Sequence, residues 1–323
     1  MAKIRIGIVG SGGTARSHAE QFAGLDAAQV VAVASRNIQT GTQLTQKFDA
    51  EFEPDWENLL EREDLDGVVI TTHNDSHGEI SINALSADKH VFSEYPLARS
   101  IAEGEKAIAL AKSKQRVLRI SHPETVSNLH KAIKRKRQNL GNLLLASFLR
   151  LTPGRGGRPE ILFNLPVSGP PAHFFIYHIY PVIDLFGGVS WVEAGAAYEG
   201  LTNLGTYDRF ANTVNVGFKT GGIGQWTWAG GIEIRAAEQR QHYVMADGTI
   251  TSEGGWRCST GLQIEEIQPI DAPRISLQEL WLREILDGDT GAAHADAETA
   301  LEAIKVSLSG EQSILESRRI VLP

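Results

Sequence analysis

A glycine-rich segment directly after the first apolar run is the feature that most constrains the fold. The run Lys3–Val9 (KIRIGIV) is typical of a buried strand, and Gly10-Ser11-Gly12-Gly13-Thr14-Ala15 follows it and opens a helical pattern. The spacing G-x-G-x-x-A between a strand and a helix is typical of a dinucleotide-binding turn. Gly10 would make the tight turn, Gly12 would admit a pyrophosphate, and Ala15 would let the helix pack on the strand. The residues expected at the cofactor are Gly10, Gly12, Gly13, Thr14 and Ala15. A glycine turn in a domain that binds nothing is the alternative.

Short apolar runs alternate with helical patterns through the first part of the chain. The expected strands after the first are Val30–Ala34, Gly67–Thr72, His90–Phe92 and Arg116–Ile120. Helical patterns lie between them, as in Ser76–Ser86 and Ser100–Lys114, the second with a capping box of Ser100 and Glu103. Such alternation favours a parallel sheet covered by helices. We predict an NAD(P)-binding Rossmann domain over residues 1–122.

The pattern changes after about residue 122, and the rest of the chain is predicted to form a second domain, 123–323. A helix is expected over Glu124–Asn139, and longer alternating strands follow it, separated in several places by Gly-rich turns. These strands are Leu144–Leu151, Trp191–Tyr198, Thr213–Phe218, Gly224–Trp228 and Tyr243–Ala246. Two helices close the chain, Ser276–Leu286 and residues 295–316. The fold class is therefore α/β plus α+β, with an open, mostly antiparallel second sheet that is covered on one face.

Composition limits the partners of the chain. Its 323 residues suit two domains, and its net charge of −8 argues against nucleic acid, because phosphate binding needs a basic face. The basic run Lys131–Arg137 is interpreted as a solvated helix face. A single cysteine, Cys258, cannot form an internal disulfide and fits a reducing compartment. Since no apolar run approaches the roughly 18 residues of a membrane span and no signal-peptide pattern is present, we expect a cytoplasmic protein without a membrane partner. No cluster has metal-ligand spacing, so no metal is expected.

The end of the second predicted strand bears on the choice of cofactor. An NAD site usually has an acidic residue here to accept hydrogen bonds from the ribose 2′-hydroxyl, whereas this chain has Ser35-Arg36. Ser35 leaves room for a 2′-phosphate and Arg36 can pair with it. The sequence therefore favours NADP(H) over NAD(H). The alternative is that Arg36 only stacks on the adenine, as it could with either cofactor.

Three further segments carry a resemblance to a known family. They are Val68-Val69-Ile70-Thr71-Thr72 followed by His77, Lys89-His90-Val91-Phe92-Ser93-Glu94-Tyr95-Pro96-Leu97-Ala98, and Ile183-Asp184-Leu185-Phe186. With the glycine turn, they resemble the glucose–fructose oxidoreductase / inositol dehydrogenase (Gfo/Idh/MocA) family. The resemblance implies a Rossmann domain joined to an open sheet that forms the substrate face and often the oligomer interface. It thus implies a small-molecule substrate and a homo-oligomer built through the C-terminal sheet. The further residues expected at the cofactor are Thr72, His73, Asn74, His77, Glu94, Tyr95 and Pro96.

The chain departs from the family at the proton-transfer residues. Sugar and polyol dehydrogenases of the family use a Lys in E-K-P and an Asp and a His near the I-D-L segment. Here those positions hold Tyr95, Tyr177 and Pro181. Oxidising an alcohol needs a base with a pKa near neutral, and tyrosine has a pKa of about 10. The candidate catalytic residues are therefore Tyr95, Tyr177 and His178. A tyrosine here suits a hydrogen-bond donor or a stacking platform better than a base, and His178 is either a displaced acid/base or a packed helix histidine.

The Glu-Tyr-Pro variant is similar to the biliverdin reductases of this superfamily. The chain also has Arg137–Gly141 (RQNLG) and Asp184–Gly187 (DLFG) in common with them. Such a reductase adds hydride to an electron-poor carbon and need not deprotonate an alcohol. Those reductases place arginines near residues 177–181, where this chain has none, and Arg155 and Arg158 are the nearest alternatives for pairing with a carboxylate. Two other hypotheses stay open: a sugar or polyol dehydrogenase that uses His178, and a nucleotide-binding sensor without catalysis.

Overall fold

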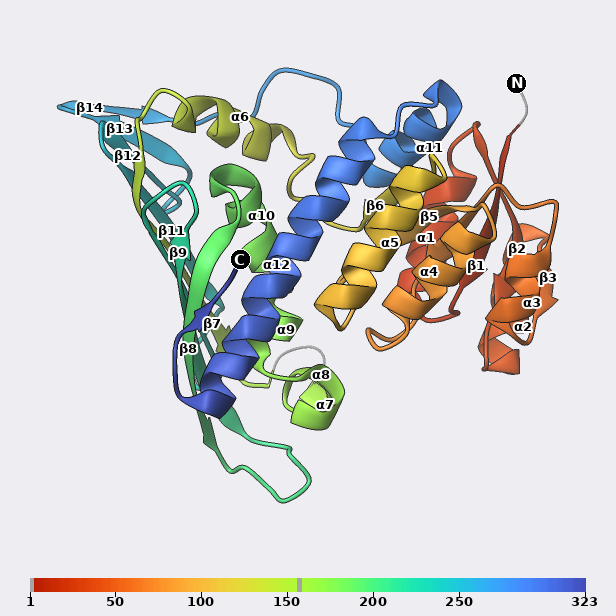
Figure 1. The fold of residues 1–323 in the computed structure, drawn as a ribbon, viewed down its shortest axis with the longest axis horizontal. Coiled ribbons are helices and arrows are strands. Elements are labelled where there is room, and N and C mark those ends of the chain that lie inside the picture. Colours follow the sequence, from red (N-terminus) through yellow and green to blue (C-terminus); the bar gives the residue numbers. More distant parts are fainter. Residues whose placement is uncertain (1–2, 156–158) are drawn as a thin grey trace. The chain divides into compact units, whose positions relative to one another are not determined.

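Two sheets of different type organise the chain (Figure 1). The computed structural model describes residues 3–155 and 159–323. Met1–Pro123 and Ile275–Leu301 form one unit, and Glu124–Arg274 and Glu302–Pro323 form the other. One sheet is parallel and the other is mostly antiparallel, which confirms the predicted fold class.

The first unit contains a six-stranded parallel sheet in the order β3-β2-β1-β4-β5-β6. Its strands are β1 (Ile4–Val9), β2 (Ala28–Ala34), β3 (Glu51–Glu53), β4 (Gly67–Ile70), β5 (His90–Ser93) and β6 (Leu118–Ile120). Five helices alternate with them: α1 (Gly13–Ala23), α2 (Ile38–Phe48), α3 (Trp56–Glu61), α4 (His77–Ser86) and α5 (Ile101–Ser113). β1 and β4 are almost wholly buried, as their uninterrupted apolar runs predict.

The second unit contains a nine-stranded sheet in the order β14-β13-β12-β11-β7-β10-β9-β8-β15. The strands are β7 (Leu143–Pro153), β8 (Val189–Glu199), β9 (Arg209–Phe218), β10 (Ile223–Ile232), β11 (Glu238–Met245), β12 (Gly248–Thr251), β13 (Arg257–Thr260), β14 (Gln263–Glu266) and β15 (Ile320–Val321). Only β7 and β10 among these strands pair in parallel.

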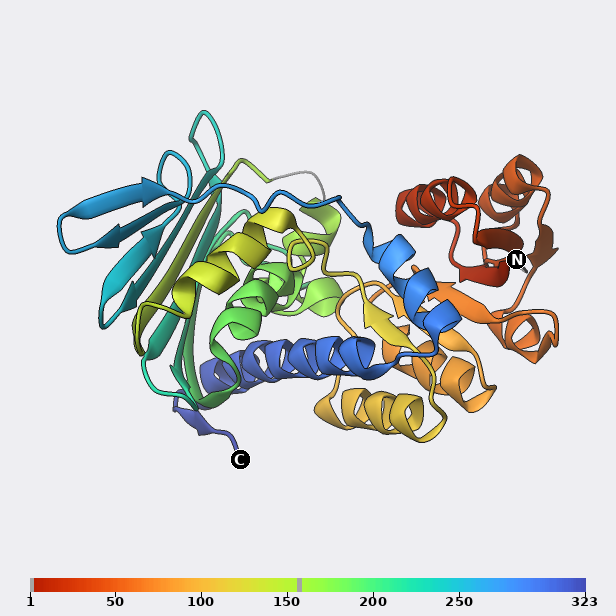
Figure 2. The same cartoon turned by 90° about the horizontal axis from the view of Figure 1, so that it is seen from above.

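One face of this second sheet is covered by helices (Figure 2). The helices of the unit are α6 (Asn128–Arg137), α7 (Pro159–Leu162), α8 (Leu165–Ser168), α9 (Pro171–Phe174), α10 (Ile176–Phe186) and the later part of α12 (Gly291–Glu316). Helix α6 begins four residues later than Glu124, the predicted start, because the Ser127 hydroxyl caps it by accepting a hydrogen bond from the backbone N–H of His130 at 3.1 Å. Cys258 is buried in β13.

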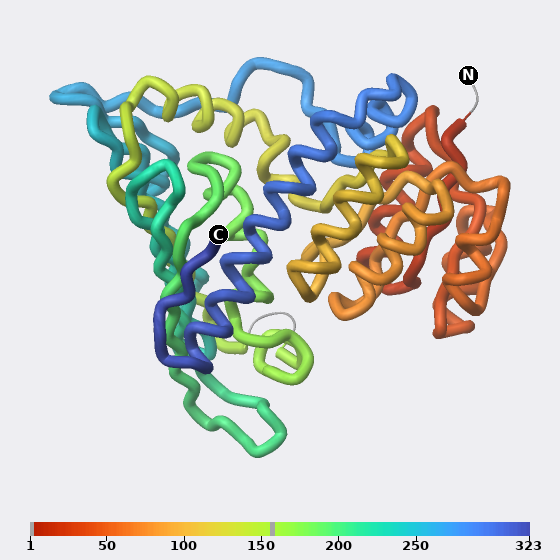
Figure 3. The backbone as a smooth tube through the Cα atoms, viewed as in Figure 1, coloured from red at the N-terminus to blue at the C-terminus, as the bar shows by residue number. Residues whose placement is uncertain are grey.

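The chain returns to the first unit near its end, which differs from the predicted division at residue 122. Helix α11 (Leu277–Asp287) and the beginning of α12 belong to the Rossmann unit (Figure 3). The Trp281 indole is fully buried and donates to the carbonyl oxygen of Val91 in β5 at 3.1 Å. Glu284 forms a buried ion pair with Arg119 of β6.

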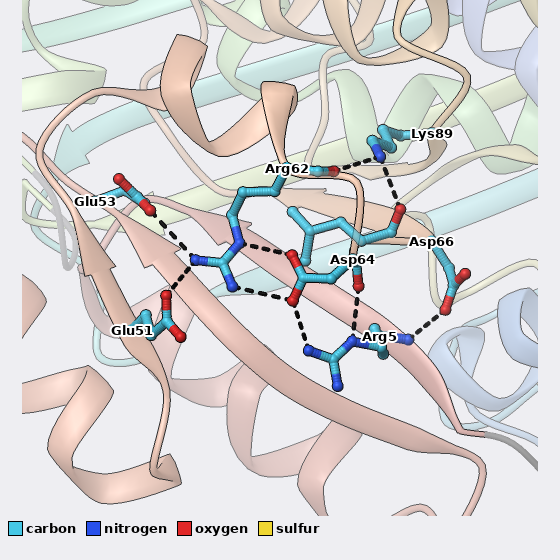
Figure 4. A network of polar contacts seen from close by, with 8 residues as sticks. Arg5, Glu51, Glu53, Arg62, Asp64, Asp66 and Lys89 are labelled. Carbon is cyan, nitrogen blue, oxygen red and sulfur yellow. Dashed lines mark hydrogen bonds and ion pairs between the residues drawn. The ribbon is translucent and has the colours of Figure 1, made fainter.

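A network of charged residues lies where the parallel strands begin (Figure 4). Arg62 donates to both carboxylate oxygens of Asp64 at 3.0 Å, and the Arg5 side chain binds the same carboxylate. Lys89 is buried and donates to two backbone oxygens, those of Arg62 and Leu65. All these residues precede or begin β1, β4 or β5. The network therefore holds together the end of the sheet opposite the glycine turn, and the carboxyl ends of the strands are left for the ligand.

Candidate active site

The glycine turn has the backbone geometry that its sequence predicts. Gly10 has φ of 117°, and a Cβ there would lie 2.5 Å from Oγ1 of Thr71, so only glycine fits. A Cβ on Gly12 or Gly13 would meet no atom within 4 Å. Gly12 is the N-cap of α1, and it has no side chain to accept a hydrogen bond from the N–H groups of the first turn. The turn therefore offers open space and unpaired donors to an anion, which fits a dinucleotide pyrophosphate.

A cluster of hydroxyl groups stands beside this turn, at the end of β2. Ser11 Oγ lies 2.7 Å from Ser35 Oγ and 2.6 Å from Thr40 Oγ1. Asn37 caps α2 by accepting a hydrogen bond from the backbone N–H of Thr40 at 3.1 Å. Arg36 is exposed next to the cluster. Hydroxyl donors, a helix N-terminus and a guanidinium are thus grouped where β2 ends, with no acidic residue at 35 or 36.

The loop after β4 is held in place by a buried histidine. His77 Nδ1 lies 2.9 Å from the carbonyl oxygen of Pro96, and its Nε2 lies 3.1 Å from that of Thr72. Burial lowers the pKa of His77, and the hydrogen bonds to these two carbonyls act in the opposite direction. Ser76 Oγ donates to Thr72 Oγ1 at 2.8 Å. His73 is exposed and Asn74 is partly exposed. His77 therefore joins the loops that follow β4 and β5, and its contacts are with the protein backbone.

A second histidine fixes the acidic residue of the Glu-Tyr-Pro segment. His18 of α1 lies 2.7 Å from Glu94 through Nε2, and its Nδ1 accepts a hydrogen bond from the Gln278 amide of α11 at 2.8 Å. With Nδ1 occupied as an acceptor, Nε2 carries the proton and donates to Glu94. Sequence reasoning did not find this relay, because Gln278 is remote in the chain and no local pattern marks it.

Tyr95 and His122 form a stacked pair at the ends of the neighbouring strands β5 and β6. Their ring centroids are 5.4 Å apart, with an interplanar angle of 16°. Complete burial lowers the pKa of His122 to about 3, so its ring is neutral at physiological pH. This arrangement presents two aromatic rings, one of them the neutral imidazole of His122, where the family that the sequence resembles has the Lys of E-K-P.

In the second unit, His178 lies within an aromatic cluster. Its Nδ1 accepts a hydrogen bond from the Trp228 indole at 3.1 Å, and its backbone oxygen accepts one from Trp226 at 3.1 Å. The Phe175 ring stacks on the imidazole at 5.3 Å. Burial, with a smaller contribution from the charge of Arg150, lowers the pKa of His178 to about 3. Both tryptophans are buried in the core.

Tyr177 lies beside His178, with ring centroids 4.2 Å apart. Burial raises its pKa, so it is a neutral phenol at physiological pH. The predicted site residues thus fall into two groups. Those expected at the cofactor lie in the first unit, at the carboxyl ends of β1, β2, β4 and β5, whereas Tyr177 and His178 lie on α10 of the second.

The arginine suggested for carboxylate pairing is already engaged. Arg155 donates to the carbonyl oxygen of Tyr207 at 3.2 Å, lies over the Phe163 ring at 5.1 Å and is 3.7 Å from Asp208. Arg158 lies outside the described residues. The structure instead brings Arg150 of β7 into electrostatic contact with Tyr177 and His178. Sequence reasoning missed Arg150, although it stands in a strand that was predicted.

The described part of the chain shows neither a metal site nor a membrane-spanning helix. There, no group of three or more His, Cys, Asp or Glu side chains could hold a metal ion. No described helix is both long and apolar enough to cross a membrane.

Comparison with known proteins agrees with this architecture. Residues 4–122 match the model of an oxidoreductase family with an NAD-binding Rossmann fold, GFO_IDH_MocA. Inositol 2-dehydrogenase of Pseudomonas fluorescens is 34% identical over 112 residues, 34% of this chain and 33% of that protein. Biliverdin reductase A of Mus musculus is 31% identical over 138 residues, 43% of this chain and 44% of that protein. The matches therefore span less than half the length of these relatives.

A solved structure is similar over both units. It is the biliverdin reductase of Synechocystis sp. PCC 6803 in complex with biliverdin and NADP+, with a TM-score of 0.82 and 25% identity. The similarity covers 96% of this chain and 99% of that one. The family model matches residues 4–122, and the likeness to this solved structure extends over both units.

Proposed function

We propose that this protein is an NADPH-dependent reductase of a conjugated substrate of the bilin type. The observation that carries the proposal is the Tyr95–His122 stack at the position of the family's catalytic lysine. A reductase that delivers hydride to an electron-poor carbon can work with neutral aromatic groups there. A dehydrogenase that must remove an alcohol proton cannot, because it needs a base with a pKa near neutral. The likeness to the cyanobacterial biliverdin reductase supports the same choice.

Residues of the first unit would hold the cofactor by the contacts that their geometry allows. The unpaired N–H groups of the glycine turn suit the pyrophosphate. Ser35, Thr40 and Arg36 suit a ribose 2′-phosphate, which accepts hydrogen bonds and carries charge. When bound, NADPH would supply the hydride. The lack of an acidic residue at 35 or 36 favours NADPH over NADH.

The Glu94-Tyr95-Pro96 segment would position the substrate side of the site. His18 and Gln278 hold the Glu94 carboxylate, and the carbonyl of Pro96 is held by His77. Tyr95 is thus anchored on both sides in the chain, and its ring is stacked on His122. In this proposal Tyr95 positions a flat conjugated substrate by stacking or by its hydroxyl group, and it is not an obligatory base.

A sugar or polyol dehydrogenase is the second candidate, favoured by the inositol dehydrogenase relative. It would require His178 to remove the alcohol proton. Two observations weigh against that role: the pKa of His178 is lowered to about 3, and its Nδ1 already accepts a hydrogen bond from Trp228. A nucleotide-binding sensor without catalysis remains the third candidate, since the glycine turn fits it equally well.

The deciding experiment is a substrate comparison with purified protein. NADPH oxidation is followed with biliverdin, and NADP+ and NAD+ reduction are followed with myo-inositol and a panel of sugars. We expect NADPH-dependent loss of biliverdin absorbance and no turnover of polyols. The variant Gly12→Val, which should not bind the cofactor, is the control for background reduction. Turnover of a polyol without turnover of biliverdin would refute the proposal, and turnover of neither would favour the sensor.

A further inference from the structure

Arg150 is a partly buried cation without an acidic partner in the described part of the chain. Its Nε is buried and makes no hydrogen bond, and its Nη1 makes only a long one, 3.4 Å to Oε1 of Gln239. Taking a guanidinium out of water is costly unless an anion or several acceptors compensate it. An amide at 3.4 Å compensates little, so the described protein atoms leave this charge under-satisfied.

The side chain of Arg150 projects from the covered face of the second sheet. Phe148, two residues earlier on β7, lies 4.5 Å from the His178 ring of α10, and residues two apart on a strand share a face. Trp228 is the in-register neighbour of Arg150 on β10. The charge of Arg150 acts on both Tyr177 and His178. The guanidinium therefore lies among neutral aromatic groups.

A second unsatisfied donor follows on the same face. Thr152, two residues after Arg150, has a buried Oγ1 without a hydrogen-bond partner. Four buried side-chain polar atoms without partners are found in the described residues, and two of them are Arg150 Nε and Thr152 Oγ1. A carboxylate has two acceptor oxygens, so it can take one hydrogen bond from a guanidinium and another from a hydroxyl.

We propose that Arg150 and Thr152 form a binding site for a carboxylate group of the substrate, which is a conjugated acid and not a neutral polyol. This inference rests on the proposed function and adds the chemical group by which the second unit would recognise the substrate. Biliverdin carries two propionate groups, so one of them can occupy the site. Arg155, with its carbonyl, ring and carboxylate contacts, does not offer such a site.

The test compares an acid with its neutral ester. Wild-type protein, Arg150→Gln and Arg150→Lys are assayed with NADPH and either biliverdin or biliverdin dimethyl ester. We expect Arg150→Gln to raise KM for the acid roughly tenfold or more, the value of a charged hydrogen bond, and to change KM for the ester little. Arg150→Lys should restore part of the preference for the acid, because it keeps the charge. A purely structural role would alter both substrates equally.

Arg240→Gln is the matched control. Arg240 lies on β11 of the same sheet, in register with Leu149 and therefore on the opposite face from Arg150, and it is exposed. It should leave both KM values unchanged. The inference is wrong if Arg150→Gln binds acid and ester as the wild type does, or if it weakens both alike.

A binding measurement separates this inference from the proposed function. Tryptophan fluorescence, to which Trp228 contributes, is titrated with 1-naphthoate and with 1-naphthamide in the presence of NADPH. If biliverdin is not reduced but naphthoate binds more tightly than naphthamide only when Arg150 is present, the carboxylate site stands and the proposed function fails. If biliverdin is reduced without any preference for acid over ester, the function stands and the site fails. Wild-type protein that shows no preference for the acid in either assay overturns the inference.

Discussion

Gly10 and Gly12 are required in the glycine turn for different reasons. Gly10 is required by the backbone, because its φ of 117° and the 2.5 Å approach of Thr71 Oγ1 exclude a side chain. Gly12 has φ of −75° and open space around its missing Cβ, so the protein tolerates a side chain there and only a ligand would not.

Gly12→Val should therefore give a folded protein that has lost cofactor binding. The valine would occupy the space through which a pyrophosphate reaches the backbone N–H groups. Calorimetric titration with NADPH and a thermal unfolding curve measure the two properties. Gly10→Val is the contrast, expected to lower the melting temperature. NADPH binding by Gly12→Val with parental affinity would mean that the turn is not the cofactor site.

The choice between cofactors is expected to depend on Arg36. Arg36→Ala should weaken NADPH binding by about 1.5–3 kcal/mol, the value of a charged hydrogen bond, and leave NADH binding nearly unchanged. The two dissociation constants of each protein, measured by calorimetry at fixed ionic strength, give this difference. Equal affinity of the wild type for NADPH and NADH would contradict the assignment, since Arg36 would then only stack on the adenine.

Tyr95 should matter for positioning and not for proton removal. Tyr95→Phe keeps the ring that stacks on His122 and removes only the hydroxyl, so turnover should fall by at most about tenfold, the worth of one hydrogen bond. Tyr95→Lys should not create polyol dehydrogenase activity, because the Asp and His of the family are also absent. Complete loss of turnover in the Phe variant at every pH would instead make Tyr95 an essential proton donor.

At the scale of elements, α11 is the segment that completes the Rossmann unit. It lies more than 150 residues beyond β6 in the chain, yet Glu284 pairs with Arg119 of that strand, and both side chains are almost inaccessible, at 7% and 3% exposed. Asp296 of α12 lies 3.4 Å from the same guanidinium. Removing one partner of such a pair leaves the other charge buried without an opposite charge to compensate it.

Glu284→Gln should destabilise the first unit by about 3 kcal/mol, near the lower end for a broken buried pair because Asp296 remains. Chemical denaturation followed by far-ultraviolet circular dichroism measures the shift. Lys112→Gln is the control: its partner is Glu298 of α12 and both groups are about half exposed, so the loss should stay below about 1 kcal/mol. Equal effects of the two substitutions would show that α11 is not held in this way.

The orientation of β7 explains why the sequence pattern did not indicate Arg150 as a site residue. Leu145, Leu149 and Leu151 alternate with Arg150 and would by pattern alone be placed on the covered face. The structure covers the other face, because Phe148 packs on α10 and its neighbours Trp226 and Trp228 fill the same layer. The leucines are left on the open face, where Leu145 is 38% exposed.

At the scale of the whole molecule, this open face supports the proposal of a homo-oligomer built through the second sheet. The apolar row continues from β7 to β10, where Ile223 is in register with Leu145 and half exposed. A second copy of the chain would bury these side chains.

Sedimentation velocity tests the assembly. The wild type should sediment as a dimer or larger, and the double variant Leu149→Glu, Leu151→Glu should shift toward monomer, because two charges on each copy would be buried together. Leu204→Glu is the control, at a residue 80% exposed in the loop between β8 and β9, outside the sheet. A monomeric wild type, or a double variant that assembles normally, would refute the proposal.

The sequence by itself determined what depends on neighbours in the chain. The strand–glycine–helix turn, the capping serine at 100, and the apolar runs of the parallel sheet are local signals, and the structure confirms them. The glycine turn and three further short segments likewise predicted the resemblance to the oxidoreductase family whose model matches residues 4–122.

The tertiary structure alone decided what depends on contacts between distant segments. Gln278 reaches His18, α11 joins the first unit, Trp228 occupies Nδ1 of His178, and Arg150 lies on the covered face of its sheet. In each case the outcome follows from burial against a partner far away in the chain, and periodicity within one segment carries no information about that partner.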